Sequence, residues 1–301
     1  MKIKALEALV AAIEEGSLRS AARRIGTSQP ALTKLVRELE IELAAVLLER
    51  HSKGVIATAQ GQVLFDHAKN VLNELSTASD LIQQMDGRMQ GELNIAAVPV
   101  AMMLLIPETL RTFNRAYPDI RLRVSEEMFI EQLQRLRKGE VDMVVGGIPD
   151  NLPAGEFITE SLMETTMVVV AREGSRHART KRLSDLANEH WIYTGTSQKT
   201  GYAARLFEAH GMSAPPAGAM VNSTLALLAL LGSGDLLGLM PEQIISHRLG
   251  KNITRVPIQE EGLPLTVGVM IRSSSVVSPA IRHFISHLHR AAHHLETKCS
   301  P

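Results

Sequence analysis

The sequence predicts a mixed α/β protein with a small helical unit, one long helix and a larger unit of alternating strands and helices. Three observations lead to this prediction. Apolar residues recur at helical spacing in three short blocks before residue 43. A proline-free stretch, 59–86, then repeats apolar residues at heptad spacing. From residue 92 onward, short apolar runs alternate with amphipathic runs, which is typical of an α/β fold with largely parallel sheets.

Composition narrows the function classes. At 301 residues the chain is long enough for two or three domains, and 45% hydrophobic residues are enough for sizeable cores. The aromatic fraction of 3% argues against a stacking platform for single-stranded nucleic acid. The single cysteine, Cys299, excludes a disulfide framework and a cysteine metal cluster. No apolar run is long enough for a bilayer and no signal-peptide pattern is visible, so we expect a cytoplasmic protein without a membrane partner.

Three short helices are expected at the start of the chain. The first ends at Gly16, since glycine favours a helix C-terminus. The second begins after Ser17, whose hydroxyl suits an N-cap, and ends before Gly26. Ser28 caps the third helix, and Pro30 is tolerated in its first turn, where the missing N–H is not needed.

The third helix separates its residues onto two faces. One face is an apolar stripe at i, i+3, i+4 and i+7 made by Leu32, Leu35, Val36 and Leu39. The other face carries side chains that can read base edges or phosphates in a major groove: Gln29, Pro30, Thr33, Lys34 and Arg37. Spacing alone leaves two interpretations open, a DNA-recognition helix and an ordinary three-helix bundle with a solvated polar face.

A basic hairpin is expected after the third helix. Residues 46–51 and 54–58 have the character of two short strands joined by a turn with Lys53 and Gly54. Arg50, His51 and Lys53 would lie against a phosphate backbone and carry no sequence information. Residues 1–58 hold nine Lys and Arg against seven acids, so the interpretation depends on where the charges point.

Several short motifs in this region resemble the LysR-type transcriptional regulators. They are Gly16–Ala22, Ser28–Thr33, Leu39-Glu40, Leu47–Arg50 and Thr58–Gly61. The resemblance implies a winged helix-turn-helix over residues 1–58 that binds double-stranded operator DNA. The DNA contacts it implies are Ser28, Gln29, Pro30, Thr33, Lys34, Arg37, Arg50 and Lys53. The sequence departs from the family pattern at Ala44, usually glycine, at Leu48, most often phenylalanine, and at Thr33, usually serine.

Residues 59–88 are predicted to form a linker helix with a heptad seam: Leu64, Ala68, Val71, Leu75, Ala78, Ile82 and Met85. Pairing of two such helices in a homodimer would present two recognition helices at a fixed spacing. The alternative is that the seam packs on its own chain. The resemblance further implies a homotetramer, and Gly87 and Gly91 mark a hinge into the next unit.

Residues 89–301 are expected to form the α/β unit. We predict strands at 93–97, 121–124, 141–145, 167–170, 191–193, 236–241 and 265–271. Helices are predicted at 102–116, 130–138, 202–210, 225–231 and 279–295.

This order, with Tyr117-Pro118, Gly139–Asp142 and Met240-Pro241, resembles the periplasmic-binding-protein-like effector domain of the same family. The resemblance implies two subdomains, one of about 92–164 and 268–295 and the other of about 165–267. The chain would cross between them near 164–170 and 264–272, and the last helix would return to the first subdomain.

Ligands of open α/β sheets bind outside the carboxyl ends of the strands. The loops there supply the candidate effector-binding residues Val100, Ala101, Met102, Met128, Phe129, Ile148, Thr196, Ser197, Gln198 and Asn222. In well-known family members a serine or threonine that bonds the ligand carboxylate stands where Val100 falls. A simple copy of that binding mode is therefore not expected here.

These observations predict a sequence-specific DNA-binding transcription regulator, not an enzyme, whose operator binding responds to a small-molecule effector. We expect no metal and no cofactor, and RNA polymerase is a further candidate partner. The i, i+4 histidine pairs His283/His287 and His289/His293 could face a zinc ion, but no carboxylate or cysteine motif completes a site. The alternative is a metabolite-binding protein or enzyme whose N-terminal segment serves oligomerisation.

Overall fold

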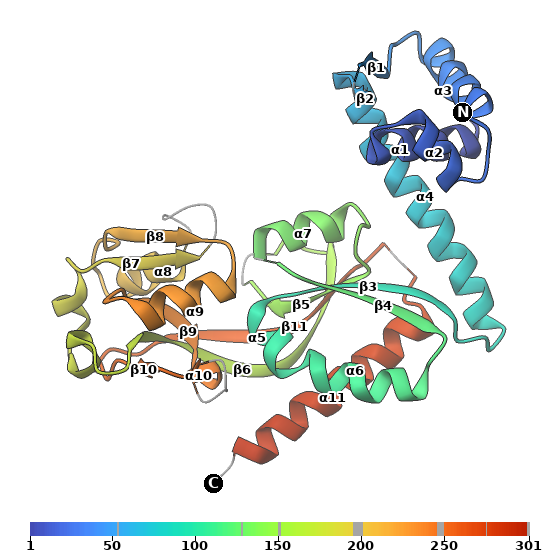
Figure 1. Cartoon of the computed structure of the whole chain (residues 1–301). Coiled ribbons are helices and arrows are strands. Elements are labelled where there is room, and N and C mark those ends of the chain that lie inside the picture. The colour runs from blue at the N-terminus through green and yellow to red at the C-terminus, as the bar shows by residue number, and fades with distance from the viewer. Residues whose placement is uncertain are drawn as a thin grey trace. The chain divides into compact units, whose positions relative to one another are not determined.

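The computed structural model describes residues 1–52, 54–127, 129–149, 152–194, 201–245, 250–274 and 276–299. The chain folds into two compact units, one that contains Met1–Arg88 together with Lys138–Glu140 and one that contains the rest of the described chain (Figure 1). Among the described residues, no helix is both long enough and apolar enough to cross a bilayer.

The first unit contains the three predicted helices, the predicted hairpin and the long helix. The helices are α1 (Ile3–Glu15), α2 (Leu18–Arg24) and α3 (Gln29–Leu43). Strands β1 (Leu48–His51) and β2 (Gly54–Ala57) pair antiparallel, and α4 (Ala59–Met85) follows. The predicted caps are present: Ser17 Oγ accepts from the amide of Ser20 at 3.4 Å, and Ser28 Oγ accepts from the amide of Ala31 at 3.3 Å.

The Thr58–Gly61 motif ties the hairpin to the long helix. Thr58 Oγ1 caps α4 by accepting from the amide of Gly61 at 2.9 Å, and it donates to the carbonyl of Val46 at 2.7 Å. A Cβ on Gly61 would overlap the carbonyl oxygen of Leu47, so only glycine fits at this close approach of two backbones. This motif therefore fixes where α4 leaves the hairpin.

The heptad seam of α4 divides into two parts. Leu64 and Ala68 pack against the core of the three helices, so this part of the seam lies on its own chain. Val71, Leu75 and Ala78 are exposed, and Ile82 and Met85 are 63% and 74% exposed. The alternative of packing on the same chain therefore holds for the first turns only.

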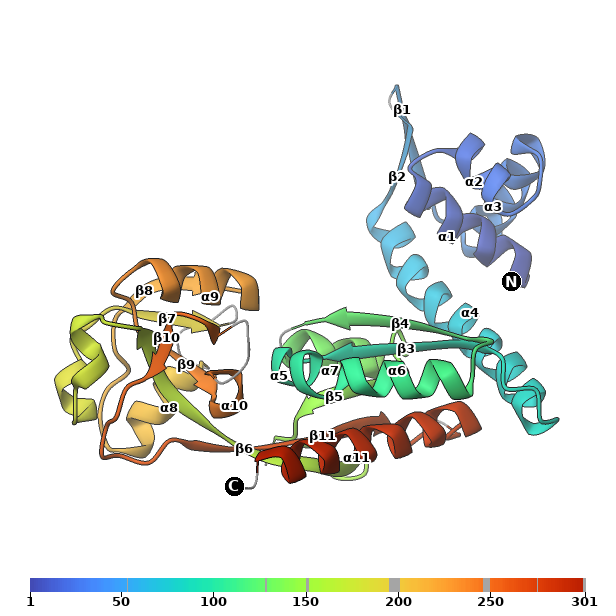
Figure 2. The same cartoon turned by 60° about the horizontal axis from the view of Figure 1, so that its bottom comes forward.

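The second unit has two lobes (Figures 1 and 2). Lobe I contains β3 (Gly91–Ala97), α5 (Pro99–Leu104), α6 (Ile106–Ala116), β4 (Ile120–Glu126), α7 (Phe129–Arg137) and β5 (Met143–Gly147). Strand β3 pairs parallel with β4 and with β5. Asn94 and Asp142 join β3 to the start of β5: the Asn94 amide donates to Asp142 Oδ2 at 2.7 Å, and the Asp142 amide donates to the Asn94 carbonyl at 2.8 Å.

Two long strands cross between the lobes, as the resemblance implies. They are β6 (Phe157–Arg172) and β11 (Leu263–Arg272), and β11 pairs antiparallel with the Phe157–Met167 part of β6. Helix α11 (Pro279–Cys299) then returns to lobe I and packs beside α6, as expected (Figures 1 and 2).

Lobe II is formed by the segment between the crossing strands. Its helices are α8 (Tyr202–Ala209), α9 (Thr224–Ser233) and α10 (Glu242–Ile245), with short 3₁₀ turns at Arg176–Arg179 and Leu183–Leu186. Its strands are β7 (Trp191–Thr194), β8 (Ala217–Val221), β9 (Gly238–Pro241) and β10 (Ile253–Arg255). Trp191 and Phe207 meet edge to face in its core, with ring centroids 5.3 Å apart.

Three details of the predicted fold are wrong. The helix expected at 102–116 is two helices, because Pro107 opens α6 and cannot donate a hydrogen bond to the preceding turn. The third strand begins at Met143 and not at Val141. The seven-stranded sheet is mixed and not largely parallel, with order β10-β6-β11-β5-β3-β4 and β9 beside β6, because β6, β9, β10 and β11 pair antiparallel.

Candidate functional sites

The polar face of α3 is open to solvent. Leu32, Val36 and Leu39 are buried against α1 and α2, as the apolar stripe predicts. The opposite side exposes Ser28, Gln29, Pro30, Lys34 and Arg37, while Thr33 is half-buried. All six predicted contact residues of this helix therefore lie on its solvent side or at its edge, around its N-terminal half.

The charges of α3 are separated along the helix. Glu38 pairs with Lys2 at 2.9 Å, and this hydrogen bond, together with the charges of Lys2 and Lys34, lowers the pKa of the Glu38 carboxyl. Glu40 Oε1 accepts from the amide of Leu47 at 2.9 Å. Within the described residues, Lys34 and Arg37 have no ion-pair partner. The two cations of this face are therefore available to a phosphate or a base edge, whereas the nearby acids are occupied.

The hairpin presents further cations. Arg50 and His51 are exposed on β1, and His51 Nε2 lies 3.5 Å from Glu49. The amide of Val55 in β2 donates to the carbonyl of Gly16 at 2.9 Å, which fastens the hairpin to the end of α1. Lys53 lies outside the described residues.

The predicted effector residues divide into three groups. Val100 lines a cavity in the second unit. Ala101 is fully buried, Met102 packs on the hydrophobic core, Ile148 is half-buried and Asn222 is exposed; none of these four lines that cavity among the described residues. Outside the described residues are Met128, Thr196, Ser197, Gln198 and the side chain of Phe129.

The cavity of about 90 Å³ lies between the two lobes of the second unit. Lobe I contributes the turn after β3 and the end of β5, and lobe II contributes the first turns of α8 and α9, strand β9 and helix α10. The described lining residues are Val98, Pro99, Val100, Gly147, Met167, Thr194, Tyr202, Thr224, Leu227, Leu239, Met240, Pro241, Ile244 and Leu265. They form a predominantly apolar wall, as is usual for a small-molecule site.

Three of the described lining side chains carry polar groups: Thr194, Tyr202 and Thr224. The hydroxyl of Tyr202 lies 3.7 Å from the point that a Cβ on Gly147 would occupy, so it reaches across from lobe II to lobe I. Burial raises the pKa of Tyr202, so the hydroxyl stays protonated and can donate to a ligand. Thr224 Oγ1 donates to Glu126 Oε1 at 2.9 Å.

Sequence reasoning missed Tyr202 and the apolar residues of lobe II in this wall, and it named Asn222 rather than its near neighbour Thr224 as an effector contact. Two signals pointed to the region: Met240-Pro241 ends a buried strand, and Gly201 and Ser223 immediately precede helices. Because ligands of open α/β sheets bind at strand ends, the candidate residues were sought in the loops and not in these first helical turns.

Two family models match the chain. The model described as "Bacterial regulatory helix-turn-helix protein, lysR family" matches residues 3–62. The model described as "LysR substrate binding domain" matches residues 86–293, more than half of the chain. Together they cover the first unit up to the start of α4 and most of the second unit.

Named relatives and a solved structure agree with these models. The chain is 26% identical to the HTH-type transcriptional regulator GalR of Pseudomonas putida, over 91% of this chain and 70% of GalR. It is 28% identical to the HTH-type transcriptional regulator GbpR of Azospirillum brasilense, over 76% of this chain and 68% of GbpR. The crystal structure of full-length CbnR complexed with its target DNA shares the fold, with a TM-score of 0.70 at 22% identity over 97% of this chain and 100% of CbnR.

These families and relatives are transcription regulators and not enzymes, which removes the alternative of an enzyme with an oligomerisation module. The α3 face and the cavity between the lobes lie within the segments that the two models match. The chain belongs to the LysR family and is a DNA-binding transcription regulator with an effector-binding domain.

Proposed function

We propose that α3 enters the major groove of operator DNA and reads it through the side chains on its N-terminal half. Gln29 suits a bidentate pair with adenine, Thr33 a thymine methyl, and Lys34 and Arg37 guanine or phosphate. Ser28 and Pro30 fix the start of the helix at the groove, while Arg50 and Lys53 hold the hairpin on the backbone. The single observation that carries this proposal is that Lys34 and Arg37 are both exposed on this face and form no ion pair with any described residue.

The proposal includes a homodimer formed through α4. Val71, Leu75, Ile82 and Met85 are 46%, 45%, 63% and 74% exposed, and they repeat every three, four or seven residues along the helix. An apolar stripe of this kind is stable in water when a second helix covers it. Two paired chains then present their recognition helices to the two halves of an operator, and a tetramer presents four.

The effector, in this proposal, is a small molecule that occupies the cavity between the lobes. Val100 and the apolar wall exclude water, and the hydroxyls of Tyr202, Thr194 and Thr224 orient the ligand. Thr196, Ser197, Gln198 and Met128, which lie outside the described residues, are proposed as further effector contacts. The regulator works in the cytoplasm without a cofactor, and bound effector alters the spacing of the recognition helices and hence its effect on RNA polymerase.

A gel shift with full-length protein and the DNA upstream of its own coding sequence tests the central claim. The unmutated protein retards this DNA at low salt. Lys34→Ala and Arg37→Ala each weaken binding by about tenfold or more, because each removes a charged contact worth roughly 1–3 kcal/mol.

Lys4→Ala is the matched control. Lys4 is an exposed cation of α1, and the neighbouring Lys2 reaches Glu38 in the C-terminal half of α3, away from the face we assign to DNA. The control variant keeps full affinity. Equal losses in all three variants would indicate a loss of general positive charge only and would contradict the assignment of α3.

A further inference from the structure

A basic groove lies on lobe I between α6 and α11, and it shares no residue with the cavity between the lobes. Two adjoining hollows of about 320 and 600 Å³ open there. Arg111, Thr112 and Arg115 line them from α6, and His287, Arg290 and His294 from α11; these six residues define the α6/α11 groove. The groove lies within the second unit, far in sequence from the residues assigned to DNA.

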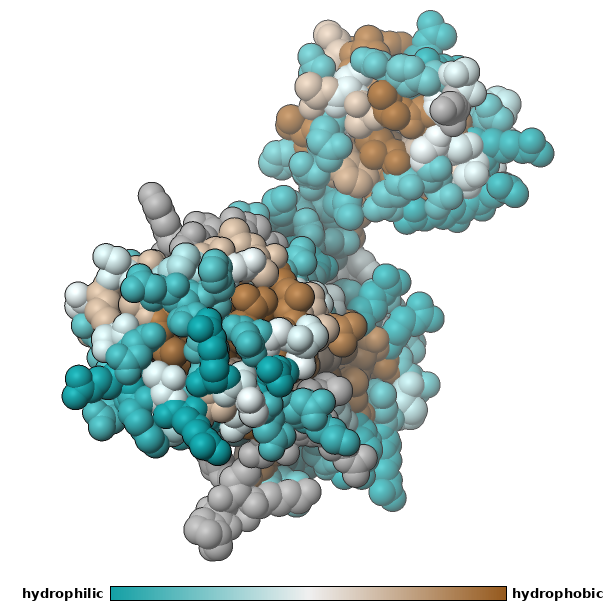
Figure 3. Space-filling model, turned by 60° about the vertical axis from the view of Figure 1, so that its left-hand side comes forward, coloured by the Kyte–Doolittle hydropathy of each residue, from teal (hydrophilic) through white to brown (hydrophobic). Residues whose placement is uncertain are grey.

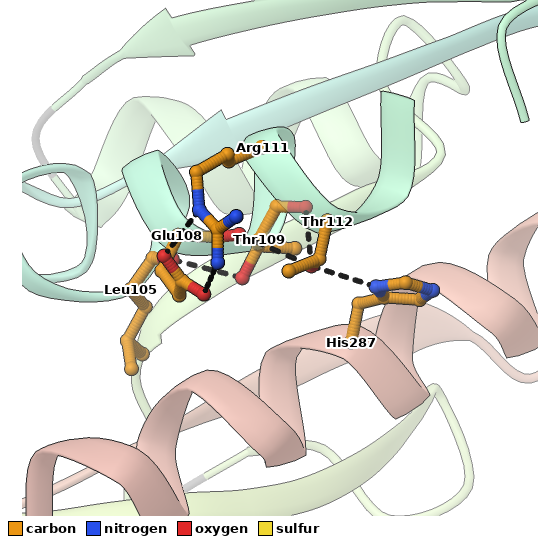
Figure 4. Close-up of polar contacts among 6 residues, drawn as sticks. All are labelled: Leu105, Glu108, Thr109, Arg111, Thr112 and His287. Carbon is orange, nitrogen blue, oxygen red and sulfur yellow. Dashed lines mark hydrogen bonds and ion pairs between the residues drawn. The ribbon is translucent and has the colours of Figure 1, made fainter. Parts of the chain in front are cut away.

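The charge balance of the groove is positive. Glu108 is the only carboxylate among its described lining residues, and it is held by Arg111, whose Nε donates to Glu108 Oε2 at 2.9 Å (Figure 4). Arg115 and Arg290 have no ion-pair partner in the part of the chain that the structure describes, although Arg290 Nε donates to the carbonyl of Ser286 at 3.3 Å. Two guanidinium groups from two helices therefore face one hollow without a counter-charge.

His287 forms the inner wall of the groove. Its side chain lies between α11 and α6, is 6% exposed, and brings Nδ1 within 2.8 Å of Thr112 Oγ1 (Figure 4). The Thr112 hydroxyl donates to the carbonyl of Glu108 at 3.1 Å, so its oxygen is left to accept from the ring. When the Thr112 hydroxyl donates to the backbone carbonyl, Nδ1 of His287 is the donor to Thr112 Oγ1, and in this tautomer the second ring nitrogen is the one that takes up a proton.

We propose that the α6/α11 groove is a binding site for a doubly charged oxyanion, a phosphate or sulfate group. The planar fork of an arginine side chain matches two oxygens of such a group, and two arginines from separate helices can hold it from two sides. The source is either the free ion or the phosphoryl group of a larger metabolite. Site and ligand are distinct from the effector cavity, so this proposal stands independently of the proposed function.

Anion binding is coupled to a proton on His287. Burial lowers the pKa of His287, and the positive charges of Arg290 and His283 lower it further. The other charged groups around the ring are Arg111, Arg115 and Glu108 on α6 and His294 on α11, whereas Glu160 of β6 reaches His289, not His287. A bound dianion opposes the effect of the arginines and raises the pKa, so by linkage the anion binds more tightly as the pH falls.

Equilibrium dialysis of full-length protein against radiolabelled phosphate, at constant ionic strength in sodium chloride, tests the site. We expect saturable binding that Arg115→Gln and Arg290→Gln each weaken about tenfold, the loss of one charge-assisted contact. Arg282→Gln, which makes the same change on an exposed residue of α11 outside the groove, leaves binding unchanged. Absence of saturable binding, or equal binding in all three variants, overturns the proposal.

Two further arms refine the result. Competition with glycerol 3-phosphate distinguishes the sources: displacement at lower concentration than unlabelled phosphate supports a phosphorylated metabolite, and the reverse supports the free ion. Labelled sulfate, which keeps its charge between pH 6.0 and 7.5, tests whether protonation of His287 strengthens anion binding. Sulfate binds more tightly at pH 6.0 in the unmutated protein and equally at both values in His287→Gln; a pH effect that survives in this variant overturns the role of His287.

Discussion

The hydroxyl of Thr224 lies 2.9 Å from Oε1 of Glu126, and this hydrogen bond joins the first turn of α9 in lobe II to the end of β4 in lobe I. Thr224 also lines the cavity between the lobes. A ligand that enters the cavity therefore meets one of the groups that hold the lobes together. Apolar side chains, brown in Figure 3, are also visible among polar ones on the surface of the second unit, and Leu225 of α9 is exposed.

Thr224→Val is predicted to loosen the two lobes. Valine keeps the shape of threonine but cannot donate, so the population in which the lobes are joined falls. Amide hydrogen exchange at the end of β4 and the start of α9 should accelerate by about tenfold or more, because a hydrogen bond to a charged group contributes roughly 1.5–3 kcal/mol. Thr194→Val, on the same cavity wall, is the control, and unchanged exchange in Thr224→Val would refute the link.

Leu75→Glu is predicted to separate the proposed dimer. Leu75 is 45% exposed in the single chain, so a charge there does not disturb the fold of one chain. In a helix pair the charge would be buried without a partner, and the dissociation constant should rise at least about tenfold. Sedimentation equilibrium measures the change, with Ser76→Glu as the control on the same helix. If the Leu75→Glu protein sedimented with the same assembly mass as the unmutated protein, the dimer interface would not include Leu75.

Ala44→Gly is predicted to stabilise the first unit. Ala44 ends α3 with φ 49° and ψ 37°, a left-handed conformation that costs a residue with a Cβ roughly 1–2 kcal/mol. Glycine removes this strain but gains freedom in the unfolded chain, so a net gain of about 0.5–1 kcal/mol is expected. Thermal unfolding of the full chain records it. Ala45→Gly, at the next position along the chain, should destabilise the first unit. A loss of stability in both variants would contradict the proposed backbone strain at Ala44.

Asp142→Asn is predicted to stabilise the second unit at neutral pH only. Burial raises the pKa of Asp142 above its usual value, in spite of the hydrogen bond from the Asn94 amide and the charge of Arg272. The folded state thus favours the protonated acid, and stability is lost as the pH rises through the raised pKa. Asparagine keeps an acceptor for Asn94 without this loss.

Urea unfolding at pH 7.5 and at about pH 4, near the ordinary pKa of aspartate, measures the difference. The increase in the free energy of unfolding caused by Asp142→Asn should be present at pH 7.5 and shrink toward zero at the lower pH. Asp119→Asn, at an exposed position, should show neither effect. A gain of equal size at both pH values would mean that the charge of Asp142 is not its cause.

Local signals predicted most of the fold. Helix caps at Ser17 and Ser28 and the Gly16 stop act over a few residues, so the first unit is close to what its sequence predicts. Strand β8 and the three-residue strand β10 were not predicted, because short edge strands carry little periodicity and depend on partners distant in the chain.

The two candidate sites were predictable to different degrees. The α3 face follows from one helical period, so its residues could be assigned without a tertiary model. The cavity wall is assembled from both lobes: Tyr202 and Leu227 are far in sequence from Val100, and only the crossing strands bring them together. The α6/α11 groove was not predicted from the sequence for the same reason, since Arg115 and Arg290 come from helices that are far apart in the chain.

The antiparallel pair of β6 and β11 sets the kind of movement that the second unit can make. Their ladder shifts register between Val267 and Gly268, and a side chain on Gly268 would strike the carbonyl of Glu160. Backbone hydrogen bonds on both sides of this point resist stretching but tolerate a change of twist. Binding of a molecule between the lobes would thus twist this two-stranded ribbon, and in the proposed oligomer the twist would change the angle between neighbouring copies.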